Sequence, residues 1–379
     1  MRLRRCLALM AGAAVVTLTT LASTDVQASR GRQVAGSASP SALQTAPCGW
    51  AATPPTTYQH VIWILFEDNR LTSVIGNAAA PYITNLARNQ CAYSRGWLDN
   101  VTSGTPQYVP GTAGANCNSE TLQNSTPPGD TCIITGSAPG KTCTSTACKN
   151  TVAIPSIFEQ VQNTSGDTWK AYEESMPSNC STLNQSGNYL VRHNPVPFFN
   201  HLRIAGQFGG NTCATNDVPF PTTTCSGTAC SIAGSPNSLL DDLNNGTLPT
   251  FSFVTPNMCD DMHTRCSTYK SRVTNGDQWL AAWLPVILAS PAYQSGNTAV
   301  FLMWDETSFN GALPNVVVAP SVVPGTVVSA TTTLNNIAAL GATEAMLGLG
   351  HIGCATGLQG DGSACPIGST ADLRGLFHI

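Results

Sequence analysis

Two long apolar runs in this chain each end in a pair of acidic residues. Residues 60–66 and residues 298–304 consist almost entirely of apolar, β-branched and aromatic side chains. A run without polar alternation predicts a strand that is buried on both faces. The acids that follow the two runs are Glu67, Asp68, Asp305 and Glu306. Because the carboxyl ends of parallel strands lie at one edge of an α/β sheet, we expect these four side chains to meet there.

Four converging carboxylates would repel one another unless a cation lay between them. The cluster therefore predicts one divalent metal ion. Oxygen ligands suit Ca, Mg or Mn, and nearby histidines also allow Zn. The alternative is that each acidic pair only caps its own loop. Two acidic pairs at matching strand ends favour the metal site, because acids with shifted pKa values concentrate at functional sites.

The remaining chain alternates predicted helices with predicted strands. Apolar spacing predicts a helix within residues 80–88, a second that has Pro155 in its first turn, and a third over residues 277–288 that Asp277 opens. Further strands are predicted at residues 168–172, 248–254 and 315–320. This alternation predicts an α/β fold with a mostly parallel sheet covered on both faces.

The segments between these elements differ in composition. Residues 111–150 and 211–235 are dense in Cys, Gly, Ser and Thr, and we expect them to be irregular insertions pinned by disulfides. Residues 29–55 are rich in Ala, Ser, Gly and Pro and predict a flexible leader. One folded domain is expected over residues 56–379.

The first 28 residues have the pattern of a secretory signal peptide, with arginines, an apolar stretch and small residues at a cleavage site. No later segment has the ~18 apolar residues that span a bilayer, so we expect an exported protein without stable membrane insertion. Loss of Cys6 with this peptide leaves an even number of the 15 cysteines. An even number in an oxidising compartment favours disulfides over a zinc site. The close pairs are Cys143/Cys148, Cys225/Cys230, Cys259/Cys266 and Cys354/Cys365, and their connectivity stays open.

The acidic net charge of the chain argues against nucleic acid as a partner. Without residues 1–28 the chain keeps 14 basic and 20 acidic residues, and charged residues make up only 10% of the whole sequence. A protein that binds a nucleic-acid backbone is expected to be basic, so nucleic acid is not an expected partner.

Polar segments that follow predicted elements supply further candidate chemistry. Residues 100–108 hold several hydroxyls, and a hydroxyl beside a metal can attack phosphorus. Arg192 and His193 lie together, and His263 follows a strand. Imidazole titrates near neutrality and guanidinium binds oxyanions, so these groups suit phosphate binding and proton transfer. Together with the acids they predict a metal-assisted hydrolase.

Several ordered motifs resemble the bacterial phosphoesterase family that contains acid phosphatases and nonspecific phospholipases C. The motifs are Glu67-Asp68-Asn69, residues 74–77, 80–83, 155–158, 169–180, 192–195, 255–257, 261–263, 276–279 and 304–306. The resemblance covers most of residues 58–350, and several motifs in the same order over such a length are more specific than any single short pattern.

The resemblance implies an alkaline-phosphatase-like three-layer α/β/α sandwich, with disulfide-rich loop insertions, that hydrolyses small phosphate esters at a divalent metal. It places Glu67 and Asp68 on the first pair of metal ligands and Asp305 and Glu306 on the second. His193 and His263 fall on histidines that contact phosphate or assist proton transfer, with Arg192 beside them. The nucleophile segment corresponds to residues 102–108, where Thr105 is the first choice by its place before Pro106 and Ser103 is the second.

The chain departs from the family pattern in three places. Asp68 stands where Asn is usual, which adds a negative charge that should tighten metal binding and repel phosphate. The nucleophile segment is one residue shorter. Asn335 and Asn336 stand where the family often has Asn and His.

Three functions follow from these observations. The first is a secreted, metal-dependent phosphatase of the acid phosphatase type, acting on monoesters through a hydroxyl nucleophile. The second is a phosphodiesterase of the phospholipase C type. The third is a secreted protein whose carboxylates hold a structural metal and do no chemistry.

Overall fold

A computed structural model describes ten stretches of the chain: residues 46–98, 108–114, 155–183, 185–203, 212–226, 229–266, 271–307, 311–329, 334–357 and 371–379. Several expectations concern residues outside these stretches. They are the signal peptide, the leader up to residue 45, Ser103, Thr105, most of the first insertion, and the pair Cys143/Cys148.

An eight-stranded sheet forms the centre of the folded part, in the order β12-β2-β11-β10-β1-β9-β3-β6. The strands are β1 (His60–Phe66), β2 (Ala92–Ser94), β3 (Trp169–Glu174), β6 (Asp217–Phe220), β9 (Phe251–Thr255), β10 (Thr298–Trp304), β11 (Val316–Val318) and β12 (Thr326–Val328). Every neighbouring pair is parallel except those of β11, which runs antiparallel to both β10 and β2. The mostly parallel sheet predicted from the sequence is therefore confirmed.

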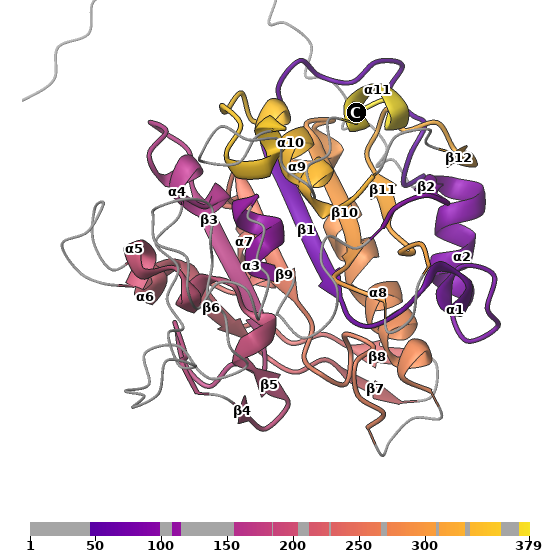
Figure 1. Cartoon of the computed structure of the whole chain (residues 1–379). Coiled ribbons are helices and arrows are strands. Elements are labelled where there is room, and N and C mark those ends of the chain that lie inside the picture. Colours follow the sequence, from indigo (N-terminus) through magenta and orange to yellow (C-terminus); the bar gives the residue numbers. More distant parts are fainter. Residues whose placement is uncertain are drawn as a thin grey trace, which may run out of the picture. The chain divides into compact units, whose positions relative to one another are not determined.

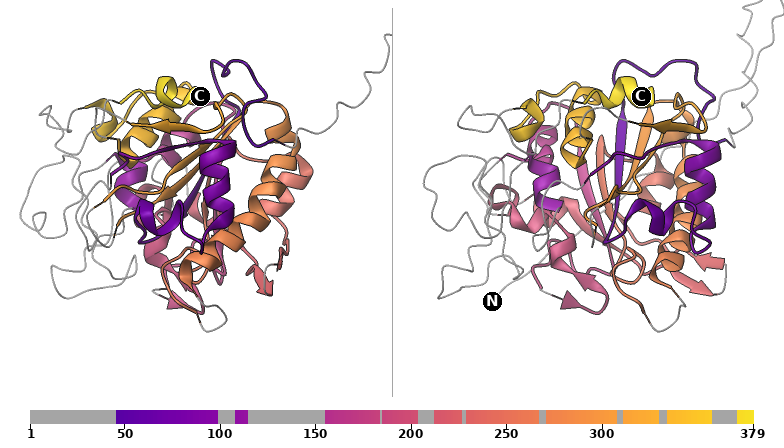
Figure 2. Two further views of the ribbon diagram at one scale, coloured as in Figure 1. Left: turned by 90° about the vertical axis from the view of Figure 1, so that its right-hand side faces the viewer. Right: turned by 45° about the vertical axis from the view of Figure 1, so that its right-hand side comes forward.

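Helices cover both sides of the sheet, as Figures 1 and 2 show. One group comprises α2 (Pro81–Asn85), α7 (Leu239–Asn245), α8 (Arg272–Ala289) and α9 (Pro291–Gln294). The other comprises α3 (Tyr108–Ala113), α4 (Ile157–Gln162), α10 (Asn336–Met346) and α11 (Leu373–Phe377). Shorter helices are α1 (Leu71–Val74), α5 (Asn200–Arg203), α6 (Cys213–Asn216), a π-helix at Leu86–Gln90, and 3₁₀ turns at Val191–His193, Val196–Phe198 and Gly353–Thr356. The arrangement is the three-layer α/β/α sandwich. Among the described residues, no helix combines the length and the apolar content that crossing a bilayer would need.

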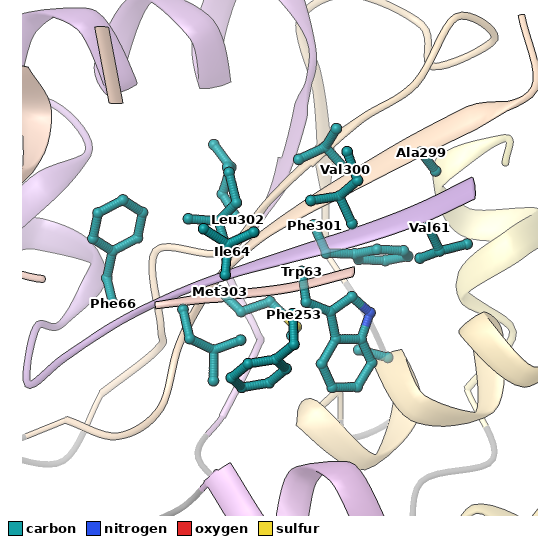
Figure 3. Packing of buried hydrophobic residues seen from close by; sticks show 14 of the residues in the cluster. Val61, Trp63, Ile64, Phe66, Phe253, Ala299, Val300, Phe301, Leu302 and Met303 are labelled. Atoms are coloured by element: carbon teal, nitrogen blue, oxygen red, sulfur yellow. The ribbon is translucent and has the colours of Figure 1, made fainter. Parts of the chain in front are cut away.

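Alternate side chains of β1 fill the two interfaces between sheet and helices. Trp63 packs on Phe251 and donates from Nε1 to the Thr343 hydroxyl of α10 at 2.9 Å. Phe66 stacks on Trp304 with ring centroids 4.9 Å apart and contacts Trp279 of α8. Figure 3 shows these strands packed among apolar side chains. Because both faces are buried, β1 has no polar position between its first residue, His60, and the acids at its carboxyl end.

Two short hairpins lie outside the sheet. They are β4 (Gln185–Ser186) with β5 (Tyr189–Leu190), and β7 (Thr224–Ser226) with β8 (Ala229–Ser231). The second insertion was expected to be irregular over residues 211–235, and this was wrong. It contains α6, the edge strand β6 and the β7–β8 hairpin. The strand was missed because Pro219 and the buried Asp217 break its apolar pattern.

Two predicted helix starts differ from the structure. Asp277 lies inside α8, and its carboxylate instead accepts hydrogen bonds from the backbone N–H groups of Tyr82 and Ile83, at 3.2 and 2.8 Å. It therefore caps the first turn of α2, a role that spacing along the chain cannot show. Pro155 lies just before α4, whose N-cap is Ser156 in a capping box with Glu159.

Four disulfides join described cysteines: Cys48–Cys91, Cys180–Cys213, Cys225–Cys230 and Cys259–Cys266. The last two are close pairs that the sequence suggested. Cys48 also shows that residues 46–55, which we assigned to the leader, pack on the domain, where the N–H groups of Gly49 and Trp50 donate to the Pro320 carbonyl.

Candidate active site

The acids at the ends of β1 and β10 lie beside each other. Phe66 pairs with Trp304 in the parallel register, so Glu67 and Asp305 leave neighbouring strands at the same level. The N–H of Asp305 donates to the Phe66 carbonyl at 3.0 Å, and the N–H of Asp68 donates to Oδ1 of Asp305 at 3.2 Å. Asp68 has a positive φ of 51°, which turns the chain sharply at this point. Three of the four acids expected to meet, Glu67, Asp68 and Asp305, are therefore neighbours in the structure.

His193 lies between two of the buried acids. Its Nε2 atom is 3.2 Å from Oε1 of Glu67, and its Nδ1 atom is 2.8 Å from Oδ2 of Asp261. His193 is the last residue of the 3₁₀ turn Val191–His193. The Thr255 hydroxyl at the end of β9 donates to the His193 carbonyl at 3.2 Å. Because Nδ1 lies beside Asp261, Nε2 is the atom that faces the Glu67 cluster.

His263 reaches the same place on the loop that follows β9. Its Nε2 atom is 3.8 Å from Oδ2 of Asp68 and 3.4 Å from a terminal nitrogen of Arg192. The backbone N–H of His263 donates to Oδ1 of Asp261 at 2.7 Å. Arg272 donates to the carbonyls of His263 and Asp68, at 3.1 and 3.2 Å, and so joins the two loops.

The electrostatics of the cluster favour a cation. Burial raises the pKa of Glu67 well above its usual value, and the charges of Asp305 and Asp261 raise it further. Burial and the charges of Glu306 and Asp68 raise the pKa of Asp305. A divalent cation among these oxygens would remove the repulsion and favour the ionised carboxylates.

The pKa values of the two site histidines are lowered, whereas those of the acids are raised. Burial, with a smaller contribution from Arg192, lowers the pKa of His193 to about 3, so its imidazole is neutral at pH 7. Burial likewise lowers the pKa of His263. Neutral imidazole is the form that can bind a metal.

At this site, a group of three side chains has the spacing of metal ligands. One atom each from Glu67, His193 and His263 lie within 4.8 Å of one another. This set differs from the four carboxylates expected from the sequence, because it replaces three acids with two histidines. Asp68 and Asp305 border the group through the contacts above, and Glu306 adds its charge beside Asp305.

Two further residues, Asp261 and Tyr108, contact the site histidines although the sequence did not mark them as candidates. Asp261 was seen only as part of a motif, although both of its carboxylate oxygens contact the site histidines. The Tyr108 ring at the start of α3 stacks on His193, with centroids 5.7 Å apart and an angle of 4° between the planes. Tyr108 is the last residue of the segment 102–108, whose other members lie outside the described residues.

Asn336 stands where the family often has His, and its hydrogen bonds support the fold of this chain. Asn336 donates to the Trp304 carbonyl at 3.0 Å and accepts from Nε1 of Trp97 at 3.0 Å. Asn335 caps α10 by accepting from the N–H of Ala338. Asn336 therefore stabilises the end of β10, directly before Asp305.

Comparison with known proteins identifies the family of the chain. The model of the phosphoesterase family matches residues 77–333. A phosphatidylinositol-3-phosphatase of Mycobacterium tuberculosis is 27% identical over 310 residues, which cover 81% of this chain and 83% of that protein. An acid phosphatase of Aspergillus fumigatus is 35% identical over 69 residues, or 18% of this chain and 14% of that protein.

A solved structure adds a weaker similarity. It is a protein of the alkaline phosphatase superfamily from Vibrio parahaemolyticus, with a TM-score of 0.44 and 12% identity over 82% of this chain and 71% of that one. The assignment rests instead on the family model, which spans the strands and loops that carry Asp261, His193, His263 and Asp305. The chain belongs to the phosphoesterase family, whose chemistry is the hydrolysis of phosphoric esters.

Proposed function

We propose that this chain is a secreted, metal-dependent phosphatase that acts on phosphate monoesters through a hydroxyl nucleophile. The observation that carries the proposal is the convergence of Glu67, Asp68 and Asp305 with His193 and His263 at the carboxyl ends of β1, β9 and β10. Ligands bind at this edge of parallel α/β sheets. The names of both relatives are those of phosphatases, which favours monoesters over the diesters of a phospholipase C.

The proposed metal would be held by Glu67, Asp68, Asp305 and Glu306, with His193 and His263 close enough to contribute. When bound, such an ion polarises a phosphoryl oxygen and lowers the pKa of a nearby hydroxyl. The oxygen-rich set suits Mg, Ca or Mn, and the two histidines suit Zn.

The chain's own residues perform two steps in this proposal. In the first, the Thr105 oxygen forms a bond to phosphorus and the ester P–O bond breaks, while Arg192 and His193 stabilise the charge on the phosphoryl oxygens. His263, whose imidazole is neutral, accepts the proton that the Thr105 hydroxyl loses and gives it to the departing alkoxide. In the second step, water attacks phosphorus, the Thr105 oxygen leaves with a proton, and phosphate is released. Ser103 is the second candidate for the nucleophile.

The signal-peptide pattern of residues 1–28 supports secretion, and the four disulfides fit an oxidising compartment. Fractionation of the producing cells tests this part of the proposal. The expected result is mature protein outside the cytoplasm that begins near residue 29, and full-length protein in the cytoplasm would contradict it.

The catalytic part is tested by three measurements on the purified protein. Release of phosphate from p-nitrophenyl phosphate is expected, and a chelator should abolish it. Phosphatidylcholine separates the alternative, since a phospholipase C would release phosphocholine from it. If the chelator lowers the melting temperature of a protein that never hydrolyses a phosphate ester, the metal is structural and the proposal fails.

A further inference from the structure

Two buried carboxyl groups beside the candidate active site take no part in the proposed mechanism. Glu173 lies near the carboxyl end of β3, and Asp217 is the first residue of β6. Both side chains are buried, and β3 lies between β9 and β6 in the sheet. Burying a carboxyl group is unfavourable unless it is neutral or hydrogen-bonded, so the partners of these two acids show what they do.

Glu173 lies opposite Thr255, the last residue of β9, in the parallel register of the two strands. The Oε1 atom of Glu173 is 3.1 Å from Oγ1 of Thr255. The same Oγ1 atom is 3.2 Å from the carbonyl oxygen of His193. The Thr255 hydroxyl therefore joins a buried carboxyl group of the sheet to the backbone of a site histidine.

The positions of the hydrogens in this chain of contacts follow from its geometry. The Thr255 hydroxyl has a single hydrogen, so it donates to one of the two oxygens at a time. It can donate to the His193 carbonyl and still be hydrogen-bonded to Glu173 when Glu173 is protonated and donates to Oγ1. Burial raises the pKa of Glu173 well above its usual value, the charge of Asp217 raises it further, and Thr255 opposes this with a smaller effect. A neutral Glu173 agrees with both the geometry and the electrostatics.

The other buried acid anchors the residue after His193. The Nδ2 atom of Asn194 lies 3.0 and 2.9 Å from the two carboxyl oxygens of Asp217. A carboxyl group accepts hydrogen bonds in either protonation state, so this anchor does not depend on the charge of Asp217. The contact through Thr255 differs, because its direction requires a donor at position 173.

The place of the His193 backbone decides where its ring lies. The Nε2 atom of the ring is 3.2 Å from Oε1 of Glu67, and in the proposed reaction the ring stabilises charge on the phosphoryl oxygens. A displacement of a catalytic group by about 1 Å can cost on the order of 100-fold in rate. A bond that fixes the His193 carbonyl therefore affects the rate of the reaction more than the binding of substrate.

We propose that Glu173 is a positioning residue, which donates a hydrogen bond to the Thr255 hydroxyl so that this hydroxyl holds the His193 carbonyl. The inference rests on the proposed phosphatase activity and adds Glu173 and Thr255 to the residues that serve it. No proton passes along this chain of hydrogen bonds. Its effect is to keep the imidazole of His193 in place while the reaction proceeds.

The test compares kcat and KM for p-nitrophenyl phosphate among variants of the full chain. Glu173→Gln keeps a donor at this position and should have about the kcat of the wild type. Glu173→Met has a similar volume without a donor, and Thr255→Val lacks the hydroxyl. Each of these two should lower kcat by about five- to tenfold with KM nearly unchanged, the factor that one hydrogen bond contributes. The double variant should be no slower than either single variant, because both changes break the same chain of contacts.

Glu344→Met is the matched control. Glu344 is also a buried acid with a raised pKa, but its carboxyl group contacts Nδ1 of His351 and the N–H of Ile352, both away from the site. This variant should keep the kcat of the wild type, and circular dichroism at the assay temperature verifies that each variant is folded.

Three results would overturn the positioning role in an active enzyme. They are an equal kcat for Glu173→Gln and Glu173→Met, an unchanged kcat for Thr255→Val, and losses that multiply in the double variant. Should Glu173→Met fail to fold, Thr255→Val decides alone. A wild-type protein that does not hydrolyse p-nitrophenyl phosphate would instead overturn the proposed phosphatase function.

Discussion

The contact between α8 and the loop of residues 259–266 gives a sharp test of how the site is positioned. Gly276 is buried in α8, and a Cβ atom there would lie 2.5 Å from two carbons of the Met262 side chain and 2.9 Å from the Asp260 carbonyl oxygen. The Gly276→Ala variant should therefore push this loop away from α8, and with it Asp261 and His263.

The effect on stability should be small because two contributions oppose each other. Alanine is favoured over glycine inside a helix by about 1 kcal/mol. Overpacking a tight contact costs about 1–3 kcal/mol. The Met262 side chain can rotate, but the Asp260 carbonyl belongs to a loop closed by Cys259–Cys266. We expect the free energy of unfolding to fall by less than about 2 kcal/mol, as the difference of these two contributions.

The effect on activity should be larger. A displacement of a catalytic group by about 1 Å can cost on the order of 100-fold in rate. We expect kcat/KM for p-nitrophenyl phosphate to fall by about 10- to 100-fold. The measurement pairs steady-state kinetics with urea unfolding, so that lost activity can be separated from lost folding.

Gly341→Ala is the matched control for this prediction. Gly341 also lies inside a helix, α10, but a Cβ atom there would meet nothing closer than 3.7 Å. This variant should be about 1 kcal/mol more stable and fully active. The reasoning is refuted if Gly276→Ala matches the control in both stability and kcat/KM.

Three further predictions concern other parts of the account. Thr105→Ala should lower kcat by at least about 100-fold while Ser103→Ala keeps most activity, because only the nucleophile forms the bond to phosphorus; the opposite ranking would move the nucleophile to Ser103. Replacing both Cys259 and Cys266 by serine should lower the free energy of unfolding by about 2 kcal/mol and reduce kcat/KM, because the disulfide closes the short loop that carries His263. Unchanged thermal melting and kinetics would contradict this. Burial raises the pKa of Glu344 to about 7, so the contribution of Glu344 to the free energy of unfolding should be complete below pH 4.5 and decline as the pH rises through 7. The melting temperature measured from pH 4 to 8 should therefore decline less in the Glu344→Gln variant than in the wild type. An equally steep decline in the variant would exclude Glu344 as its cause.

The strands at the centre of the site were predictable because their signal is local. An unbroken apolar run that ends in acids marks both β1 and β10, and parallel pairing then brings Glu67 and Asp305 together. The approximate places of β3, β9 and β11 followed from the same kind of pattern.

Other features depend on partners that are distant along the chain. Asp277 caps a helix that lies 194 residues earlier, so its place inside α8 was not visible from spacing. The same is true of Asp261, which acts through His193. The antiparallel direction of β11 follows from the path of its connections and not from its apolar pattern. A family resemblance supplied candidate roles, and the structure supplied the neighbours of each candidate.

The central claim is that Glu67 and Asp305 share one divalent cation that activates an alcohol. Its most direct test is the metal content of the purified protein, measured by mass spectrometry beside its phosphatase activity. We expect one divalent ion per chain in the wild type, and loss of both ion and activity in the Glu67→Gln and Asp305→Asn variants, with folding retained by circular dichroism. A folded Asp305→Asn variant that keeps its ion and its activity would contradict the claim.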